Sequence, residues 1–298
     1  MSASQSLTPE QLVKKIISSV KFADVLDIAQ YKDDYKKLIL QIHPDRCNHP
    51  DAPAATSRLN ELKDRYENGI DLKDDAGKLN TNDYRIVFKG DKDVLKASLQ
   101  NYELLKRGTD ENSVLLARLM PDTMKMQGDE LVAEFGVGVR AIPLSGLNLP
   151  QEHVNWILSR ILEFASLCEL KGYAHMGLTP ESIYILPDLH WIKVVSFYHV
   201  TRIGAKAKTI SGAYKNWYPQ SLFATKEATG KVDAEMSKKI AISLLGDRSG
   251  SGIKLKKTHN AAFVDFVTVS HDGCAECFVQ YRDMLRKNFV KKFYDLNM

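Results

Sequence analysis

The sequence predicts an α+β protein in which an all-α helical hairpin precedes a larger, two-lobed body. Three patterns indicate this. Apolar residues recur at helical spacing through the first seventy residues, a charged stretch without such a period follows, and short β-prone runs then give way to long helical ones. We therefore expect a helical domain at 1–70, a linker at 71–82, and a second domain at 83–298 with a small strand-rich lobe at about 83–149 and a helical lobe at about 150–298.

The first domain is expected to contain three helices. The first run, TPEQLVKKIISSVKFADVLDI, starts after the capping residue Thr8. The second must end at Pro44, because a proline pushes the residue before it out of the α region. The third covers residues 52–66 and has Gly69 as its C-cap. The apolar stripes of the three helices are Leu12, Ile16 and Val20; Tyr35, Leu38, Ile39 and Ile42; and Ala52, Ala55, Leu59, Leu62 and Tyr66.

The tripeptide His43-Pro44-Asp45 lies between the second and third helices. Two amphipathic helices joined by a short loop pack antiparallel, so the tip of this loop is expected to be exposed and rigid. The proline stiffens the turn, Asp45 can pair with an arginine, and His43 can donate or accept a hydrogen bond. These residue types suit recognition of a partner rather than catalysis.

The helix YKKLILQI, the tripeptide and the helix that carries LNELKDRYE together resemble a J domain, the module by which Hsp40-type co-chaperones stimulate Hsp70 ATPases. The resemblance covers about residues 8–70 and implies a DnaK-type Hsp70 as partner, with a cationic face that speeds encounter with an acidic groove. The contact residues that it implies are His43, Pro44, Asp45, Lys36, Lys37 and Arg46. The chain departs from the family between Ile28 and Tyr35, where the loop is shorter and some basic residues are missing.

The second domain is expected to begin with strands. The run YRIVFKGDKDVLKASL has β-prone parts on both sides of Gly90 and predicts a hairpin. ELVAEFG and VRAIPL predict two further strands, with a helix between ELLKRG and SVLLARLM. After Pro150, the run EHVNWILSRILEFASLCELKG predicts a long helix. Its buried stripe is expected to contain Val154, Ile157, Leu158, Ile161 and Ala165.

Four later segments resemble protein kinases in the order that kinases show. YAHMGLTPESIYIL is similar to the catalytic loop, and WIKVVSFYHV stands where kinases carry Asp-Phe-Gly. AYKNWYPQSLF resembles the Ala-Pro-Glu segment, and KVDAEMSKKIAISLLGD resembles the buried helix that follows, with Asp233 at the position of its structural aspartate. The resemblance covers about residues 83–295 and implies a two-lobed kinase-like domain, as in bacterial and phage fusions of a J domain with such a domain.

The residues that kinases use for catalysis are replaced in this motif. His175 stands at the motif's histidine, but Gly177 replaces the catalytic aspartate. Ser182 stands at the magnesium-binding asparagine, and Ser196 stands at the aspartate of Asp-Phe-Gly. Phosphoryl transfer depends on a positioned carboxylate and on metal ligands. We therefore expect a pseudokinase without a metal site or a resident cofactor, in which His175 packs and hydrogen-bonds within its loop; whether it binds nucleotide stays open.

The lysine that holds phosphate in kinases is assigned to Lys96 in DVLKAS, with Glu103 or Glu111 as its helix partner. Arg118 in LLARLM is the rival for this position. Between Tyr84 and the lysine there is room for one hairpin only, and the chain has no Gly-x-Gly-x-x-Gly loop. The small lobe is therefore expected to be reduced.

Composition limits the other classes of function. The net charge of +4 is small and evenly spread, so we expect no nucleic-acid partner. No apolar run reaches the ~18 residues of a membrane span, and MSASQSLTPEQ lacks the apolar core of a signal peptide, so cytoplasmic residence is expected. Cys274 and Cys277 form a single Cys-x-x-Cys with His271 as at most a third ligand, and structural thiols are favoured over a metal or redox site.

Three functions remain in view. The first is a J-domain co-chaperone that recruits and stimulates an Hsp70 while its kinase-like body binds a client protein. The second is a divergent nucleotide-dependent transferase, for which the retained His175, Lys96 and Pro180-Glu181 argue. The third is an interaction scaffold whose helical hairpin no longer engages Hsp70, which the shortened stretch before Tyr35 would explain.

Overall fold

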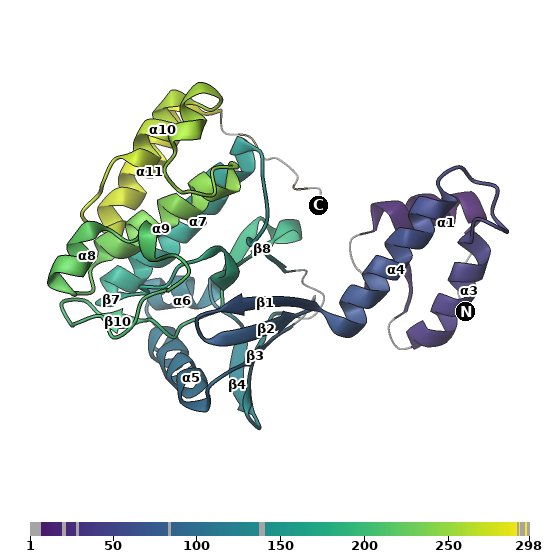
Figure 1. The fold of residues 1–298 in the computed structure, drawn as a ribbon, viewed down its shortest axis with the longest axis horizontal. Coiled ribbons are helices and arrows are strands. Elements are labelled where there is room, and N and C mark those ends of the chain that lie inside the picture. The colour runs from purple at the N-terminus through teal and green to yellow at the C-terminus, as the bar shows by residue number, and fades with distance from the viewer. Residues whose placement is uncertain are drawn as a thin grey trace. The chain divides into compact units, whose positions relative to one another are not determined.

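The computed structural model describes residues 7–19, 22–27, 30–82, 85–136, 141–290, 292 and 296. The chain forms two compact units (Figure 1). The first comprises the chain up to Ile70 together with the short stretch 80–83, and the second comprises 71–79 and the chain from 84 onward. Helices dominate the first unit and the second mixes helices with sheet, which confirms the predicted α+β class.

The first unit contains the helices α1 (Pro9–Ser18), α2 (Phe22–Val25), α3 (Tyr31–Ile42) and α4 (Ala52–Asn68). Near the start of α3, the Tyr31 hydroxyl donates to the Glu67 carboxylate at 3.2 Å. At the other end, the Ile42 carbonyl accepts a hydrogen bond from Thr56 at 3.3 Å. The two helices therefore run antiparallel over one apolar core. The buried residues of that core are Leu12, Val13, Ile16, Phe22, Val25, Ile42, Cys47, Ala52, Ala55, Leu59 and Leu62.

The single helix expected over residues 8–28 is wrong in its length. α1 ends at Ser18, and Ser19 is extended. The hydroxyls of Ser18 and Ser19 both donate to the Lys15 carbonyl, at 3.0 and 2.7 Å, and such local bonds compete with helix continuation. Val20, which the predicted stripe included, lies outside the described residues.

Within the described part of the second unit and its junction, five strands form one sheet in the order β1-β2-β3-β5-β4. Central β5 is antiparallel to β3 and to β4, so that Ala133 lies opposite both Ile86 and Met124. Helix α5 packs against β4 and β5 (Figure 1). The elements are β1 (Ile70–Asp74), β2 (Gly77–Thr81), β3 (Arg85–Lys89), α5 (Lys92–Lys106), α6 (Glu111–Arg118), β4 (Thr123–Gln127) and β5 (Glu130–Glu134).

Residues 71–82 are not a linker but contribute two strands to the five-stranded sheet. They form β1, a two-residue turn and β2, which supply the strands that the sequence seemed to lack. In the turn, Asp74 Oδ1 accepts the N–H groups of Ala76 at 2.8 Å and Gly77 at 3.1 Å. The sequence analysis did not predict these strands. The exposed positions of β1 carry Asp71 and Lys73, and these charged residues made the segment look like a linker rather than a strand that alternates exposed and partly buried residues.

The hairpin predicted around Gly90 is also wrong, because α5 starts where the second strand was expected. Asp91 caps this helix by accepting the N–H groups of Asp93 at 2.9 Å and Val94 at 3.1 Å. Gly90 instead lies against the β1–β2 turn, where a Cβ atom would sit 2.2 Å from the Ala76 carbonyl oxygen. A helix cap therefore prevails over the β-propensity of the residues around it.

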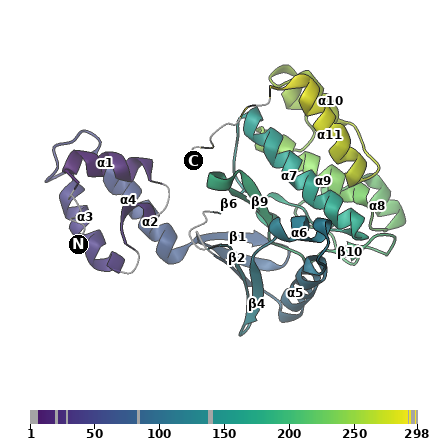
Figure 2. The ribbon, with the colours of Figure 1, turned by 180° about the vertical axis from the view of Figure 1, so that it is seen from behind.

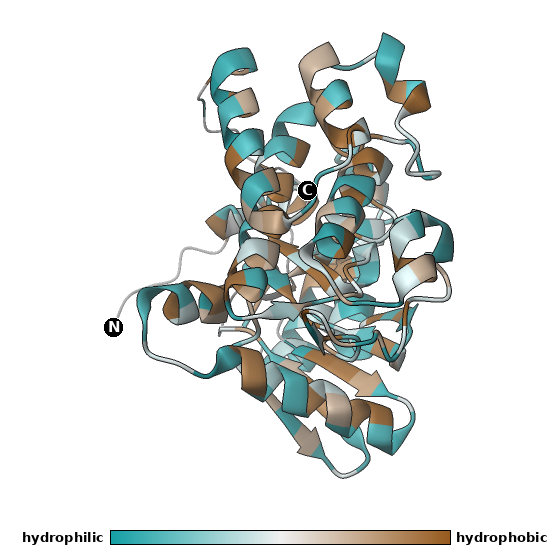
Figure 3. Ribbon diagram, turned by 90° about the vertical axis from the view of Figure 1, so that its left-hand side faces the viewer, coloured by the Kyte–Doolittle hydropathy of each residue, from teal (hydrophilic) through white to brown (hydrophobic). Residues whose placement is uncertain are grey.

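The helical lobe is built on α7 (Gln151–Leu170), α9 (Gly230–Leu244) and α11 (Cys274–Asn288), which lie side by side (Figures 1 and 2). The predicted long helix is confirmed as α7, and every residue of its predicted stripe is fully buried. Helices α8 (Gln220–Thr225) and α10 (Ala261–Thr268) complete the helical part. Figure 3 shows apolar and polar residues mixed along the helices of the chain, and in α7 and α9 most residues are buried.

Short strands form two further small sheets in the second unit. β6 (Ile142–Pro143), β8 (Ile183–Leu186) and β9 (Trp191–Val194) form one antiparallel sheet, and β7 (Tyr173–Ala174) pairs with β10 (Thr201–Arg202). Of the strand predicted from VRAIPL, only 142–143 is strand, and 139–140 lie outside the described residues. Across the described ranges, no helix has both the length and the apolar content needed to cross a membrane.

All four cysteines are buried and free: Cys47, Cys168, Cys274 and Cys277. Burial raises the pKa of the Cys168, Cys274 and Cys277 thiols above the ordinary value, so these side chains stay protonated at neutral pH. No group of three His, Cys, Asp or Glu side chains in the described part of the chain is arranged to hold a metal ion.

Candidate functional sites

The tripeptide His43-Pro44-Asp45 is exposed at the end of α3. The His43 side chain is 46% exposed and the Asp45 side chain 86%. His43 Nδ1 accepts the Asp45 N–H at 3.3 Å and lies 3.5 Å from the Asp45 carboxylate. Ile42, directly before the tripeptide, and Cys47, two positions after it, are buried in the core of the first unit. The tripeptide is thus a solvent-exposed turn with an apolar anchor at each end.

Positive charge lies near the tripeptide. Lys36, Lys37 and Arg46 are all exposed, as the sequence predicts. Lys37 Nζ lies 3.3 Å from the Asp34 carboxylate. This ion pair is exposed to solvent, so it contributes little free energy and does not bind Lys37 tightly. These cations remain accessible to an acidic surface.

A second copy of the tripeptide, His49-Pro50-Asp51, follows six positions later and was missed by the sequence analysis, although inspection for repeats would find it. His49 Nδ1 accepts the Asp51 N–H at 3.1 Å, which reproduces the local bond of the first copy. However, the His49 side chain is only 15% exposed, and Asp51 is the N-cap position of α4. The second copy therefore starts a helix, whereas the first one is displayed.

A buried polar centre lies in the second unit. Its buried members are His175, Gly177, Ser182, Ser196, His199 and Asp233, and the partly buried Asp74 and the more exposed Asp75 lie at its border. Its His175 ring lies edge-on to the rings of Phe164 and Phe197, at centroid distances of 5.6 and 5.9 Å. His175 Nε2 is 2.6 Å from the Ser196 carbonyl oxygen, and Nδ1 accepts the Gly177 N–H at 3.3 Å. Burial lowers the pKa of His175 to about 3, so the ring is neutral and donates through Nε2.

This neutral ring gives a prediction about pH. The folded-state pKa of His175 lies below the unfolded value of 6.5, so its contribution to stability is complete above pH 6.5 and is lost as the pH falls toward about 3. We expect the difference in free energy of unfolding between the wild type and His175→Gln to shrink between pH 7 and pH 4. Urea unfolding at both pH values measures it, and a constant difference would contradict a neutral buried ring.

Asp233, in the first turn of α9, positions the loop that carries His175. Its carboxylate oxygens accept the N–H groups of His175 at 2.5 Å and Met176 at 2.7 Å. Met176 has φ of 64°, a conformation that a side chain with Cβ adopts only when its surroundings enforce it. The Tyr218 hydroxyl donates to the Met176 carbonyl at 2.7 Å and holds the loop from the other side. Burial raises the pKa of Asp233 to about 7 against the opposing effect of the two N–H groups.

His199 occupies the space beside Gly177. A Cβ atom at position 177 would lie 2.3 Å from His199 Cδ2, which is closer than any packing arrangement allows. The His199 ring is fixed on both sides, because Nδ1 is 2.8 Å from Thr209 Oγ1 and Nε2 is 3.2 Å from Asp75 Oδ2. The space into which a side chain at position 177 would project is therefore filled by an imidazole.

The β1–β2 turn covers the polar centre. From this turn, Asp75 contacts His199 and also accepts the Gly212 N–H at 3.2 Å. Burial opposes ionisation of Asp75, but hydrogen bonds from His199 and Ser211 keep its pKa below the ordinary value. An ionised carboxylate thus ties the turn to the segment around 209–212.

The two serines of the centre are used locally. The Ser182 hydroxyl donates to the Thr179 carbonyl and accepts the Thr179 N–H, both at 2.9 Å, in a reciprocal cap. Ser196 supports Asp74, whose pKa is raised by burial and lowered in part by the hydrogen bond from Ser196. Ser182 is thus engaged in a local cap, and Ser196 is engaged by Asp74.

No protein-family profile matches the chain, and no curated protein matches it. Among the solved structures that match is that of vaccinia related kinase 3, with 12% sequence identity. The match covers 74% of this chain and 92% of that one, with a TM-score of 0.47. The match is to a protein kinase, and we draw no conclusion about activity from a likeness of this degree.

Lys96 does not lie on a strand and is not part of the polar centre, so its assignment is corrected. It is exposed on α5 and lies 3.8 Å from the exposed carboxylate of Asp93. The lysine at the end of β3 is Lys89, which closes the run Ile-Val-Phe-Lys and pairs with Glu130 at 2.8 Å. The pattern of three apolar residues and a lysine was available in the sequence, but the lysine was sought in the second strand of the predicted hairpin, which is in fact α5.

The structure brings together His175, Gly177, Ser182 and Ser196, as the sequence motif implies. The candidate helix partners Glu103 and Glu111 are exposed. The partners that α5 does offer to the centre are different: Asn101 Nδ2 donates to the Phe197 carbonyl at 2.9 Å, and Ser98 Oγ accepts the Phe197 N–H at 3.3 Å.

Proposed function

We propose that this protein is a J-domain co-chaperone, or adaptor, that recruits a DnaK-type Hsp70 and stimulates its ATPase. In this proposal, the second unit binds a client or partner protein and does not transfer phosphate. The observation that carries the proposal is the exposed His43-Pro44-Asp45 turn at the end of one helix of an antiparallel pair.

The physical features of the turn support recognition by contact. Pro44 restricts the backbone, and the buried neighbours Ile42 and Cys47 fix both ends, so little conformational entropy is lost on binding. The Asp45 carboxylate is exposed and can accept a bidentate pair of hydrogen bonds from an arginine. The exposed Lys36 supplies positive charge that raises the rate of encounter with an acidic partner.

For the second unit, we propose a kinase-like domain without phosphoryl transfer. The support is the sheet with α5 beside it, followed by a helical lobe in which Asp233 holds the His175 loop. Gly177 offers no base, and His199 with the covering turn fills the position from which one would act. Because position 177 supplies no carboxylate and no group of three possible metal ligands is found among the described residues, we infer that the polar centre does not stabilise phosphoryl transfer.

The test is the rate of ATP hydrolysis by an Hsp70 in the presence of the full chain and of its Asp45→Asn variant. We expect the wild type to stimulate hydrolysis and the variant to lose about tenfold or more of that effect, because one charge-assisted contact is removed. Asp45 is exposed, so the variant keeps the fold.

The second tripeptide supplies a matched control. Asp51→Asn makes the same chemical change six positions away, at an N-cap position whose side chain makes no capping bond. This variant should stimulate as the wild type does. Equal stimulation by wild type and Asp45→Asn would refute the proposal and leave an interaction scaffold, and loss in Asp51→Asn alone would transfer the role to the second copy.

A further inference from the structure

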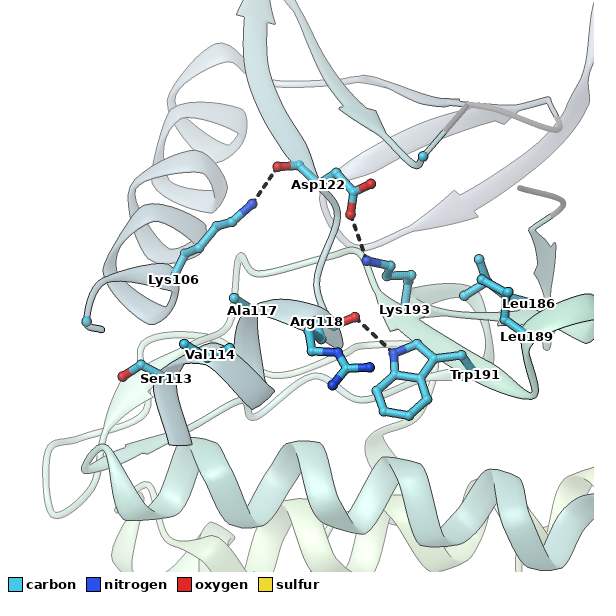
Figure 4. A pocket seen from close by; sticks show the side chains of 12 residues that line it. Lys106, Ser113, Val114, Ala117, Arg118, Asp122, Leu186, Leu189, Trp191 and Lys193 are labelled. Carbon is cyan, nitrogen blue, oxygen red and sulfur yellow. Dashed lines mark hydrogen bonds and ion pairs between the residues drawn. The ribbon is translucent and has the colours of Figure 1, made fainter. Parts of the chain in front are cut away.

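A cavity of about 650 Å³ lies within the second unit (Figure 4). It is bounded by the end of α5, by α6, by the β8–β9 hairpin and by the chain at Asp122. None of the described residues that line it belongs to the polar centre, so it is a separate feature. Its volume is in the range of pockets that bind small molecules, about 300–1,000 Å³.

The charges in this cavity are unbalanced. The lining contains Lys106, Arg118 and Lys193 against the single carboxylate of Asp122, an excess of two positive charges among the described lining residues. Lys193 is buried, and its Nζ lies 2.9 Å from Asp122 Oδ1. Lys106 Nζ donates to the backbone carbonyl of the same Asp122 at 2.5 Å. Two ammonium groups thus converge on one residue, as Figure 4 shows.

The environment of Lys106 shows that its charge is only partly compensated. Burial lowers the pKa of Lys106; Asp122 opposes this shift, and Lys193 adds to it by repulsion. The other acceptors of Lys106 are the neutral Tyr102 hydroxyl and the Pro121 carbonyl. An anion placed between the two lysines would relieve their repulsion.

The remaining wall of the cavity is largely apolar. It contains Val114, Ala117, Leu186 and Leu189, together with the side of Trp191. The indole is held firmly, because its N–H donates to the Arg118 carbonyl at 2.9 Å. The guanidinium groups of Arg118 and Arg160 lie 5.2 and 4.2 Å from its ring centroid. A ligand that fits this lining has an apolar body and a compact anionic head.

We propose that this cavity is a binding site for a small phosphomonoester with an apolar body. A phosphomonoester carries about −1.5 to −2 charges at neutral pH, which matches the excess of two positive charges. Lys193 and Arg118 would contact the phosphate, Lys106 would add positive charge beside it, and the leucines and alanine would contact the body. This site is independent of the Hsp70 contact proposed above.

Isothermal titration calorimetry with phenyl phosphate tests the proposal on the full chain. We expect saturable binding with a Kd below about 1 mM, and about tenfold weaker binding by Lys193→Met and by Arg118→Gln. Benzyl alcohol, which lacks the anion, and inorganic phosphate, which lacks the body, should each bind more weakly than phenyl phosphate. Lys231→Met removes a lysine that pairs with Asp272 at 3.1 Å outside the cavity, and should leave the Kd unchanged.

Several results would overturn the site. They are the absence of saturable phenyl phosphate binding, a Kd that Lys193→Met and Arg118→Gln leave unchanged, and equal weakening by Lys231→Met. Arg118 is exposed, so Arg118→Gln remains informative even if loss of the buried Lys193 impairs folding, and circular dichroism verifies the fold of each variant.

Discussion

Replacing Asp233 with alanine is expected to lower the free energy of unfolding of the second unit by about 2–6 kcal/mol. The substitution leaves two buried donors, the N–H groups of His175 and Met176, without their acceptor, and each such loss costs about 1–3 kcal/mol. Met176 also loses one of the contacts that enforce its left-handed backbone. Denaturant unfolding followed by tryptophan fluorescence measures the change, since Trp156, Trp191 and Trp217 all lie in this unit.

A control and a pH series separate this role from general sensitivity to mutation. Asp265→Ala, at an exposed position on α10, should change stability by no more than about 0.5 kcal/mol.

The folded-state pKa of Asp233, about 7, lies above the unfolded value of 3.8. The contribution of Asp233 to the free energy of unfolding is therefore complete below pH 3.8 and is lost as the pH rises through about 7. Wild type should therefore exceed Asp233→Asn by more at pH 5 than at pH 8, and the opposite order would contradict the burial of this carboxyl group.

Introducing the aspartate that kinases carry, by Gly177→Asp, is expected to destabilise the second unit by about 1–3 kcal/mol or more rather than to create a kinase. The new Cβ would overlap the His199 ring at 2.3 Å, and overpacking of a buried site costs about this much. The added carboxylate would also lie near the ionised Asp75 that His199 contacts. Thermal unfolding measures the loss, and radiolabelled ATP tests for phosphoryl transfer.

The steric part of this effect has its own controls. Gly177→Ala should destabilise, whereas Gly212→Ala should not, because a Cβ at position 212 meets no atom within 4 Å. Adding His199→Ala to Gly177→Ala should restore part of the lost stability.

Wild type should show no thermal shift with about 1 mM ATP and magnesium, since a ligand that binds the folded state raises its stability. Phosphate transfer by Gly177→Asp, or a clear shift of the wild type, would instead favour the transferase.

Local signals predicted the parts of the fold that local physics controls. Pro44 ends α3 and Gly69 follows the end of α4, where its φ of 71° suits a residue without Cβ. The 3.6-residue period of α7 was unambiguous because the helix is long. β1 and β2 were missed because five-residue strands with charged exposed faces carry few apolar residues, and the cap at Asp91 was misjudged because β-prone residues precede it.

The residues of the polar centre likewise divide into those that the sequence motif predicted and those that it did not. His175, Gly177 and Ser182 come from one continuous motif, so sequence order alone placed them together. The contact between Asp75 and His199 joins residues 124 positions apart, through a turn that had been assigned to a linker. The spacing of these two residues in the sequence does not predict their contact. The contact forms because β1 and β2 pack into the sheet and place Asp75 beside His199.

The burial of every native cysteine makes the chain a convenient carrier for a fluorescent label. Maleimide dyes react with accessible thiolates, and Cys47, Cys168, Cys274 and Cys277 are all shielded from solvent. A thiol engineered at the exposed Asn48, between the two tripeptides, would therefore be modified selectively without first removing the others. A dye at that position would sit beside the displayed turn and change its emission when another macromolecule docks there.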